Sequence, residues 1–438
     1  MRIAVVGAGI TGLATARTLV DAGHEVVLVE RAGIPASAAS AQNGGQLSYA
    51  FVAPLASPAT LWQIPRLMLD PGSPLRVRPG LSAAAWRWCI DFLLACSARQ
   101  ARDTTSVLLS LGALSRERFG AWRTGLDGNP IEFERNGKLV IYRDAGSWRA
   151  AQRQVALQAG RGPEQQLCSP LDCLRAEPSL LNDEAPLHGG VLTPSEEVAD
   201  CERVCRVLAD SLAGQPGFEA HWHTDVLGWD HDGERVGALR LRGPAGEQRL
   251  PADAFVVASG VAAPRLLAPL GVRLPIAPLK GYSIELPAAR LRAMPRLSVT
   301  DSAVKVVFAP LGAGERLRLR VAGMAELVGP NLQIDERRIA QLAEATRSLF
   351  GFSTPQWRPQ LADLRPWAGL RPATPTGLPC IGRAGRWRNL YVNAGQGALG
   401  FTLAFGSAAV LAAELLGGPS PLRRLPRMGV HFRPAGGT

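Results

Sequence analysis

Three glycines near the amino terminus, Gly7, Gly9 and Gly12, limit how this chain can fold more than any other feature of its sequence. They follow an apolar stretch at residues 3–6 and begin an amphipathic stretch, after which a second apolar segment ends at Glu30. A strand, a G-x-G-x-x-G turn, a helix and a strand that ends in an acid are typical of a dinucleotide-binding βαβ unit. The sequence therefore predicts a parallel sheet that binds a dinucleotide.

The residue types in this segment have separate roles in binding. Gly7 permits the tight turn, Gly9 lets the backbone approach the pyrophosphate, and Gly12 lets the helix pack against the strand. The amino terminus of the helix offers free N–H groups and a favourable dipole to the pyrophosphate. The carboxylate of Glu30 is expected to accept hydrogen bonds from the adenosine ribose and to repel a 2′-phosphate, which argues against NADP.

The charge of the chain does not indicate nucleic acid as a partner. The 438 residues carry a formal net charge of +11, but only three residues are lysines, so the excess is almost wholly arginine. Arg316, Arg318 and Arg320 alternate with apolar residues, and we interpret them as the solvated face of a strand. The net charge leaves an anionic membrane surface open as a partner.

The cysteines and histidines predict neither a disulfide framework nor a metal site. The seven cysteines are an odd number without a C-x-x-C pair, and Cys201 and Cys205 share a helical face with leucines, as core residues do. His221 and His223 have no cysteine or carboxylate at ligand spacing. A reducing, cytoplasmic environment fits this pattern.

No segment is predicted to cross a membrane or to direct secretion. The first apolar run already forms the nucleotide-binding strand, so it is not interpreted as a secretory signal. Residues 397–416 carry one charge, Glu414, and have nearly the length of a membrane span. Three glycines and a preceding strand favour a buried helix there. We therefore expect a cytoplasmic protein whose membrane contact, if any, is with the inner face.

The remaining segments predict two kinds of sheet. Residues 83–126 have a helical pattern, 133–143 are interpreted as a hairpin that turns at Asn136-Gly137, and Asp200 is expected to cap a helix that ends at Leu212. Parallel-sheet patterns occur at 254–260 and 390–393. Residues 281–286, 304–308 and 317–323 alternate as in an antiparallel sheet, and a helix is expected at 335–350.

The predicted fold is α/β, or α+β overall, with one domain inserted into the other. A Rossmann-like nucleotide-binding domain is expected at 1–85, 180–270 and 365–438, because the parallel-sheet patterns fall there. An antiparallel-sheet substrate domain is expected at 86–179 and 271–364.

Six motifs occur in the same order as in a known flavoenzyme family. They are Gly7-x-Gly9-x-x-Gly12 with Glu30, Ser40-x-x-Asn43-Gly44-Gly45-Gln46, Pro278-Leu279-Lys280-Gly281-Tyr282, Gly323-Met324-Ala325-Glu326, Trp367-Ala368-Gly369-Leu370-Arg371-Pro372-x-Thr374-Pro375, and Asn389-Leu390-Tyr391-Val392-Asn393-x-Gly395-x-Gly397 through Gly400-Phe401-Thr402. Over nearly its whole length the chain resembles the FAD-dependent D-amino-acid dehydrogenases, within the larger glycine oxidase and D-amino-acid oxidase superfamily.

The resemblance implies roles for individual residues. Arg371 would clamp the substrate carboxylate, for which a guanidinium fork is well suited, and Tyr282 would add a hydroxyl to the same carboxylate. Both are thus the implied catalytic residues, and the other implied substrate-binding residues are Gln46, Ser48, Tyr49 and Gln396. The residues implied to bind FAD non-covalently are Gly7, Gly9, Gly12, Glu30, Arg31, Ser40, Asn43, Gly44, Gly45, Gln46, Val226, Ser259, Gly260, Gly395, Gly397, Leu399, Gly400 and Thr402.

The implied reaction is the oxidative deamination of a D-amino acid to a 2-oxo acid and ammonia. Hydride would pass from Cα to flavin N5, and the electrons would go on to a quinone or another carrier. Two other activities stay open, namely oxidation of cyclic or secondary amino acids such as D-proline, glycine or sarcosine, and action on modified tRNA bases. The loop Ser48-Tyr49-Ala50-Phe51 departs from the family's usual Pro-Gly-Tyr turn, so the side-chain preference also stays open.

Overall fold

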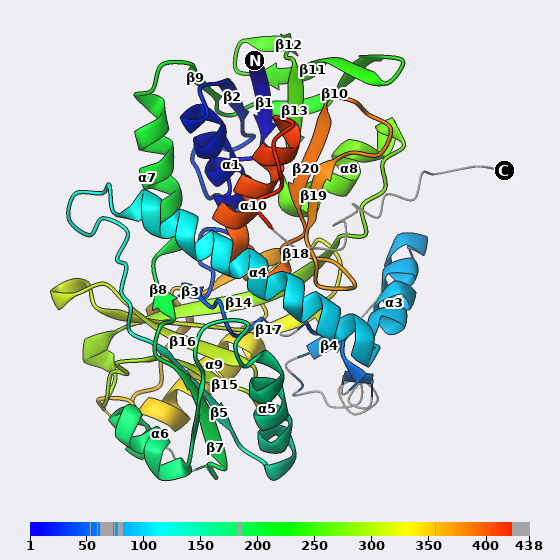
Figure 1. Cartoon of the computed structure of the whole chain (residues 1–438). Helices are drawn as coiled ribbons and strands as arrows, with labels where there is room; N and C mark the ends of the chain where they lie inside the picture. Colours follow the sequence, from blue (N-terminus) through cyan, green and yellow to red (C-terminus); the bar gives the residue numbers. More distant parts are fainter. Residues whose placement is uncertain are drawn as a thin grey trace.

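Two large β-sheets, stacked one above the other in Figure 1, organise the chain. The computed structural model describes residues 1–438 except 53, 59, 62–72, 74, 78–81, 183–184, 355 and 423–438. The upper sheet has six strands and contains the amino terminus, and the lower sheet has nine. The mixed α/β class predicted from the sequence is confirmed.

The six-stranded sheet is formed by segments that lie far apart in the sequence. Its order is β19 (Cys380–Arg383), β20 (Leu390–Ala394), β13 (Ala254–Val257), β1 (Arg2–Val6), β2 (Glu25–Val29) and β9 (Phe218–His221). All neighbouring pairs are parallel except β19 and β20. The predicted parallel strands at 254–260 and 390–393 are thus confirmed, and so is the discontinuous assembly of this sheet.

Helices cover one face of this sheet and a small sheet covers the other. The buried side chains of α1 (Ile10–Asp21), α7 (Cys201–Ala213) and α10 (Gly400–Leu415) form one hydrophobic cluster with alternate residues of β1 and β2. The intervening residues of β1 and β2 pack against β10 (Asp225–Asp232), β11 (Arg235–Gly243) and β12 (Gly246–Pro251). The predicted helix cap is confirmed, because the Asp200 carboxylate accepts hydrogen bonds from the N–H groups of Glu202 and Arg203.

In the part of the chain that the structure describes, one helical stretch, Gly397–Leu415, is long and apolar enough to span a membrane. However, 67% of its most apolar window is buried inside the molecule, where α10 packs against α1 and α4. α4 (Ala98–Arg123) crosses the middle of Figure 1 between the two sheets, and α3 (Ala83–Ala95) precedes it. The helical pattern predicted at 83–126 is therefore two helices, and the hydroxyl of Ser97 caps the second.

The nine-stranded sheet is mostly antiparallel. Its order is β18 (Trp367–Ala373), β14 (Ala277–Pro287), β17 (Arg318–Leu327), β16 (Val306–Leu311), β15 (Ser298–Asp301), β5 (Lys138–Tyr142), β7 (Gly189–Thr193) and β6 (Gln166–Cys168), while β4 (Leu75–Val77) pairs with β17. Only the pairs β15–β5 and β17–β4 are parallel. The predicted boundaries placed 189–193 and 367–373 in the nucleotide-binding part, whereas β7 and β18 pair within this sheet.

One face of the nine-stranded sheet is closed by helices, and the other faces the upper sheet. Side chains at every second position pack against α6 (Pro170–Ala176) and α9 (Glu336–Phe350), as Leu139, Val299 and Ile284 do. The remaining elements are the short pair β3 (Gln46–Leu47) and β8 (Glu197–Val198), α5 (Ala145–Gln158) and α8 (Ala263–Leu267). The alternation thus sends the intervening residues of the large sheet toward the nucleotide-binding strands.

The hairpin predicted at residues 133–143 is wrong. Gly137 does turn the chain, with a φ of +78°. However, Glu134 pairs with Val198, whereas β5 pairs with β15 and β7. A glycine turn between two apolar runs does not specify which strands will pair, because partners from distant segments compete for the same edge.

The interpretation of Arg318 and Arg320 as a solvated face is also wrong. Arg320 is only 2% exposed and forms ion pairs with Asp200 at 3.0 Å and with Glu285 at 2.5 Å. Arg318 forms ion pairs with Asp200 at 2.6 Å and with Glu132 at 2.7 Å. Both faces of β17 are covered, so these arginines are paired inside the molecule instead of hydrated.

Candidate active site

A cavity of about 800 Å³ lies between the two large sheets. Its walls combine the carboxyl ends of β1, β2 and β13, the loop at 37–48, the first turn of α10 and the open face of the nine-stranded sheet. Parallel sheets commonly bind ligands at the carboxyl ends of their strands. The site predicted from the fingerprint therefore opens onto the other sheet.

The fingerprint glycines are required by close backbone approaches. Gly7 has a φ of +110°, and a Cβ atom there would lie 2.9 Å from the carbonyl oxygen of Ala258. A Cβ atom at Gly12 would overlap the carbonyl oxygen of Gly7, so this glycine packs the helix on the strand without lining the cavity. Gly9 and the next residue do line it, and the N–H of Ile10 donates to Ser40 Oγ at 3.1 Å.

Glu30 lies at the end of β2 on the cavity wall, where an acid that binds ribose is expected. Its Oε2 atom accepts a hydrogen bond from the N–H of Ala8 at 2.8 Å, and its Oε1 atom accepts one from the N–H of Ala32 at 2.9 Å. These bonds fix the carboxylate and leave further lone pairs for ribose hydroxyls. Arg31 and Val226 line the cavity with it.

Unpartnered polar atoms in the wall fit a cofactor with many polar groups, such as FAD. The Oγ atom of Ser259 and the Oε1 atom of Gln42 are buried without a hydrogen-bond partner among the described residues, and both residues line the cavity. The first turn of α10, with Gly400 and Thr402, also lines it, so the positive end of the helix dipole faces the cavity. These groups can hold a flavin and its pyrophosphate.

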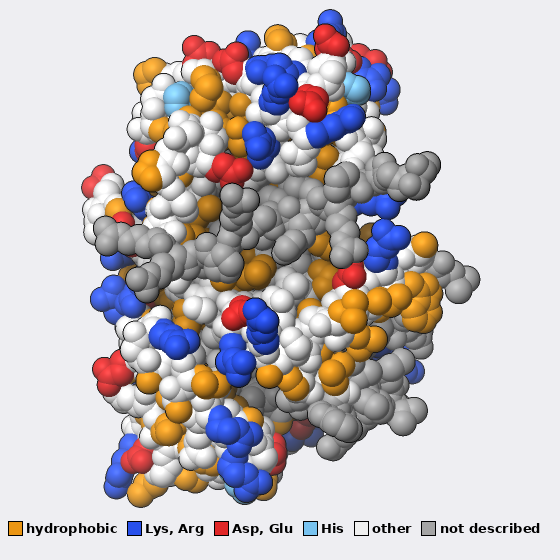
Figure 2. Space-filling view, turned by 45° about the vertical axis from the view of Figure 1, so that its right-hand side comes forward, with side chains coloured by type: hydrophobic (Ala, Val, Ile, Leu, Met, Phe, Trp, Pro, Cys, Tyr) orange, Lys and Arg blue, Asp and Glu red, His pale blue; other side chains and the backbone are white. Residues whose placement is uncertain are grey.

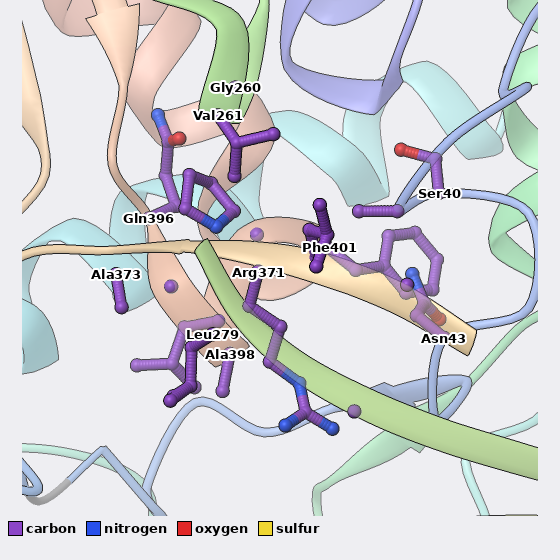
Figure 3. A pocket seen from close by; sticks show the side chains of 18 of the residues that line it. Ser40, Asn43, Gly260, Val261, Leu279, Arg371, Ala373, Gln396, Ala398 and Phe401 are labelled. Atoms are coloured by element: carbon purple, nitrogen blue, oxygen red, sulfur yellow. The ribbon is translucent and has the colours of Figure 1, made fainter. Parts of the chain in front are cut away.

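Arg371 of β18 extends into the pocket, with Leu279 and Ala398 on one side and Asn43 and Phe401 on the other (Figure 3). Its Nη1 atom donates to the carbonyl oxygen of Met324 at 2.7 Å. A side chain at Gly281 on the neighbouring strand would overlap the guanidinium. The glycine at position 281 therefore leaves the space that the Arg371 guanidinium occupies.

The guanidinium of Arg371 has its charge available for a ligand. Burial lowers the pKa of Arg371 to about 10, and no carboxylate among the described residues raises it. A buried cation is costly unless it is paired, so an anion that enters the cavity is bound strongly here.

The two tyrosines predicted at the substrate have their hydroxyls engaged elsewhere. Tyr282 touches the cavity wall, but its side chain packs in the core beside α9 and its hydroxyl donates to Glu326 at 2.9 Å. This differs from the predicted contact with the carboxylate, because alternation along β14 places Tyr282 and Gly281 on opposite faces. Tyr49 is 1% exposed, donates to Glu197 at 3.2 Å and does not line the cavity.

The three predicted amide and hydroxyl residues do line the cavity, and each is held by a partner. Gln46 donates to Ser298 Oγ at 2.7 Å. The N–H of Ser48 donates to Thr402 Oγ1 at 3.0 Å, and Gln396 donates to Asn393 Oδ1 at 2.8 Å. These bonds orient the side chains of Gln46 and Gln396 and fix the backbone at Ser48.

The structure brings most of the predicted site residues to this one cavity. Three residues of the predicted set do not line the cavity, namely Gly12, Tyr49 and Gly395. The predicted residues that do line it are Gly7, Gly9, Glu30, Arg31, Ser40, Asn43, Gly44, Gly45, Gln46, Ser48, Val226, Ser259, Gly260, Tyr282, Arg371, Gln396, Gly397, Leu399, Gly400 and Thr402.

Two lysines on the wall were not predicted. Lys138 is only 3% exposed, and its ammonium donates to Ser48 Oγ at 2.7 Å. Lys305 is the last residue of the turn between β15 and β16 and has a φ of +54°, which is unusual for a residue other than glycine. The sequence signal that could have identified them is the rarity of lysine, because the chain has only three lysines and two of them line this cavity.

The described residues contain no group of three or more His, Cys, Asp and Glu side chains that could hold a metal ion. Cys380 of β19 is buried and is not on the cavity wall, and burial raises the pKa of its thiol to about 12. A thiol with so high a pKa stays protonated and is a poor nucleophile.

Comparisons with known proteins show which family the chain belongs to. Residues 2–414 match the family DAO, FAD dependent oxidoreductase. The chain is 43% identical to D-amino acid dehydrogenase 2 of Ralstonia nicotianae over 416 residues, which cover 94% of this chain and 96% of the relative. It is 41% identical to D-amino acid dehydrogenase 2 of Pseudomonas aeruginosa over 428 residues, which cover 94% of each.

Solved structures share the fold. Glycine oxidase from Geobacillus kaustophilus superposes with a TM-score of 0.68 at 21% identity, over 97% of this chain and 99% of that one. L-proline dehydrogenase from P. horikoshii superposes with a TM-score of 0.69 at 17% identity, over 96% and 95% of the two chains. At these identities the likeness concerns the fold alone. The match over residues 2–414, together with the close backbone contacts of Gly7 and Gly12, shows that the chain belongs to the DAO family of FAD-dependent oxidoreductases.

Proposed function

We propose that the protein is an FAD-dependent dehydrogenase that deaminates D-amino acids to 2-oxo acids and ammonia. The observation that carries the proposal is Arg371, a half-buried cation on the wall of the FAD cavity with no carboxylate partner among the described residues. The relatives at 43% and 41% identity are named D-amino acid dehydrogenase, which does not favour the alternatives of cyclic amino acids or tRNA bases.

The residues of the chain bind and orient the amino acid. When bound, FAD supplies the acceptor for the hydride that leaves Cα. Arg371 holds the α-carboxylate with N–H groups that its bond to Met324 leaves available, and this fixes Cα for the reaction. The cations on the cavity wall disfavour a further positive charge, so they lower the pKa of the substrate ammonium and favour the neutral amine. Loss of the hydride from Cα and of a proton from the amine nitrogen leaves an imine. Water then hydrolyses this imine to the 2-oxo acid and ammonia.

The test is the anaerobic reduction of the FAD-loaded protein by amino acids. D-enantiomers from a panel of neutral, acidic and basic side chains are added, and the loss of flavin absorption is recorded. At least one D-amino acid should bleach the flavin while its L-enantiomer does not. Glycine, sarcosine and D-proline serve as controls for the alternative substrates. A flavin that stays oxidised with the whole panel would refute the proposal.

We propose in addition that the electrons pass to a quinone in an anionic membrane. In this proposal α3 contacts the cytoplasmic face of that membrane. Trp86, Ile90 and Leu94 on the outer side of α3 are 53%, 55% and 74% exposed. Figure 2 shows hydrophobic side chains gathered at the right, at the height of α3. Trp88 and Phe92, on the inner side of the same helix, line the cavity. α3 is therefore a short route between a lipid surface and the flavin site.

Sedimentation with anionic phospholipid vesicles tests this contact. The protein should sediment with the vesicles, and a variant with Ile90→Glu and Leu94→Glu should not. The double variant should still reduce a soluble dye but should reduce a vesicle-bound quinone more slowly. Leu157→Glu on α5 is the control, because Leu157 is 54% exposed and α5 does not contribute to the cavity wall. Equal sedimentation of the three proteins would exclude α3 as the contact.

A further inference from the structure

Lys138, another cation on the cavity wall, belongs to neither the predicted site nor the fingerprint. It begins β5, on the same open face of the nine-stranded sheet. Its ammonium donates to Ser48 Oγ at 2.7 Å and lies 4.5 Å from the centre of the Phe51 ring. An ammonium has three N–H donors, and the described residues give this one a single hydrogen-bond acceptor. Donors are therefore left for a ligand in the cavity.

Glu196 lies beside Lys138 without taking up its N–H donors, and burial raises the pKa of this carboxyl to about 7 while the charge of Lys138 opposes that shift. Its two oxygens accept hydrogen bonds from the N–H groups of Tyr49 at 2.9 Å and Ala50 at 2.6 Å, and Glu196 is not on the cavity wall. Burial lowers the pKa of Lys138 to about 8, and the charge of Glu196 opposes this shift. Lys138 is therefore protonated at neutral pH, while the carboxylate beneath it is occupied in holding the loop at 48–51.

A hydroxyl without a partner faces the same part of the cavity. Thr300 is 4% exposed, lines the cavity, and has no hydrogen-bond partner for its Oγ1 atom among the described residues. β15 pairs with β5 so that Ser298 lies opposite Lys138 and Thr300 opposite Val140. Side chains two residues apart share a face, so Thr300 and Lys138 are neighbours on adjacent strands of the open face. Together they offer an ammonium and a hydroxyl to one acceptor.

The acids among the described wall residues lie at the nucleotide-binding end, together with the cations Arg31 and Arg265, whereas the large sheet contributes cations alone. Among the described lining residues the acids are Glu30 and Asp225, which follow β2 and begin β10 at the nucleotide-binding end. The large sheet contributes Arg371, Lys305 and Lys138 and no acid. A substrate with one carboxylate would leave part of this positive charge unpaired in a buried site, and a basic side chain would add to it. A second carboxylate on the substrate would pair with the positive charge that the first carboxylate leaves unpaired.

We propose that the substrate is an acidic D-amino acid, of the D-glutamate or D-aspartate type, whose side-chain carboxylate binds Lys138 and Thr300 while Arg371 holds the α-carboxylate. The proposal rests on the D-amino-acid dehydrogenase function and adds the substrate class. It also gives a role to the loop at 48–51, whose Ser48 hydroxyl and Phe51 ring position the ammonium of Lys138.

The test compares D-glutamate with D-glutamine, which has the same shape without the charge. The FAD-loaded protein should have a kcat/KM for D-glutamate that exceeds that for D-glutamine by about tenfold to a hundredfold, the range of one charge-assisted hydrogen bond. Lys138→Met should bring this ratio close to one, Lys138→Arg should retain most of it, and Thr300→Val should lower it several-fold. Lys280→Met is the control, because Lys280 is buried on β14 and does not line the cavity.

A binding measurement separates recognition from turnover. Glutarate, which cannot be deaminated, should perturb the flavin spectrum of the unchanged protein at a lower concentration than its monoamide. Lys138→Met should remove this difference. Unchanged protein that does not distinguish D-glutamate from D-glutamine would overturn the proposal without any variant, and so would an FAD-loaded Lys138→Met protein with an unaltered ratio. Turnover of D-alanine without preference for D-glutamate refutes the substrate class alone, whereas no reduction by any D-amino acid refutes the dehydrogenase function as well.

Discussion

Replacing Arg371 with methionine should abolish most turnover while slightly stabilising the fold. A pKa lowered from 12.5 to about 10 corresponds to an electrostatic cost of about 3 kcal/mol for keeping the cation in place. Because part of the side chain faces the cavity, solvent screening reduces this cost to about 2 kcal/mol. The variant also loses the bond to the Met324 carbonyl, which contributes about 1 kcal/mol. The net gain is about 1 kcal/mol, or about 1–2 °C in Tm for a chain of this size.

Catalysis should change in the opposite direction and by much more. Two charge-assisted hydrogen bonds to the α-carboxylate contribute about 1.5–3 kcal/mol each, so their loss should lower kcat/KM by about 10²-fold to 10⁴-fold. Dye reduction measures the rates, and scanning calorimetry at saturating FAD measures Tm. Arg383→Met on β19 is the control, because Arg383 is exposed and is not on the cavity wall. It should change neither quantity.

Only one pattern of results supports this reasoning. If Arg371→Met unfolds at a clearly lower temperature and retains its kcat/KM, the guanidinium is a structural group and the carboxylate binds elsewhere. Equal losses of stability and activity would show that the variant is merely misfolded. Flavin content, measured from the visible spectrum of each protein, distinguishes this last case.

Three further predictions concern the cofactor, the core and the pH dependence. Gly12→Ala should yield protein with little bound flavin by visible absorption, because the new methyl group overlaps the backbone at Gly7, whereas Gly120→Ala on α4 meets no atom within 4 Å and should bind FAD normally. Arg320→Met should destabilise the protein by about 1.5–3 kcal/mol in chemical denaturation, because Asp200 and Glu285 each lose one of the guanidinium groups that pair with them and keep Arg318; a smaller loss than about 1 kcal/mol would contradict the pairing. The preference for D-glutamate over D-glutamine should be constant between about pH 5, above which the substrate side chain is ionised, and about pH 7. It should fall as pH rises through about 8, where Lys138 loses its proton despite the nearby charge of Glu196; a preference that persists at pH 10 would assign it to another cation.

Features with a local cause could be predicted from the sequence. The cap at Asp200 and the glycines of the fingerprint depend on a few neighbouring residues, and each is where the pattern placed it. The buried strand at 254–257 was also evident, because a continuous apolar run leaves no exposed face.

Features that depend on distant partners could not be predicted. The motif around Gly281 identified β14, but the face of the sheet to which Tyr282 points follows from the strand register and from α9. Lys138 belongs to no motif, and only the pairing of β5 with β15 places it beside Thr300 on the cavity wall. The buried ion pair of Arg320 with Asp200 likewise brings together residues that lie 120 positions apart.

The order of synthesis delays the cofactor site until the chain is nearly complete. β1 leaves the ribosome first, yet its neighbour β13 ends at Val257, and β20 and α10 follow only at residues 390–415. At about 5–20 residues per second, the fingerprint waits roughly 20–80 s for its last neighbours. During this time the apolar faces of β1 and α1 are only partly covered, because β2, α7 and β10–β12 have emerged but β20 and α10 have not. FAD uptake is therefore a late, post-translational event, and a chain that ends before β20 should aggregate or be degraded before it ever binds flavin.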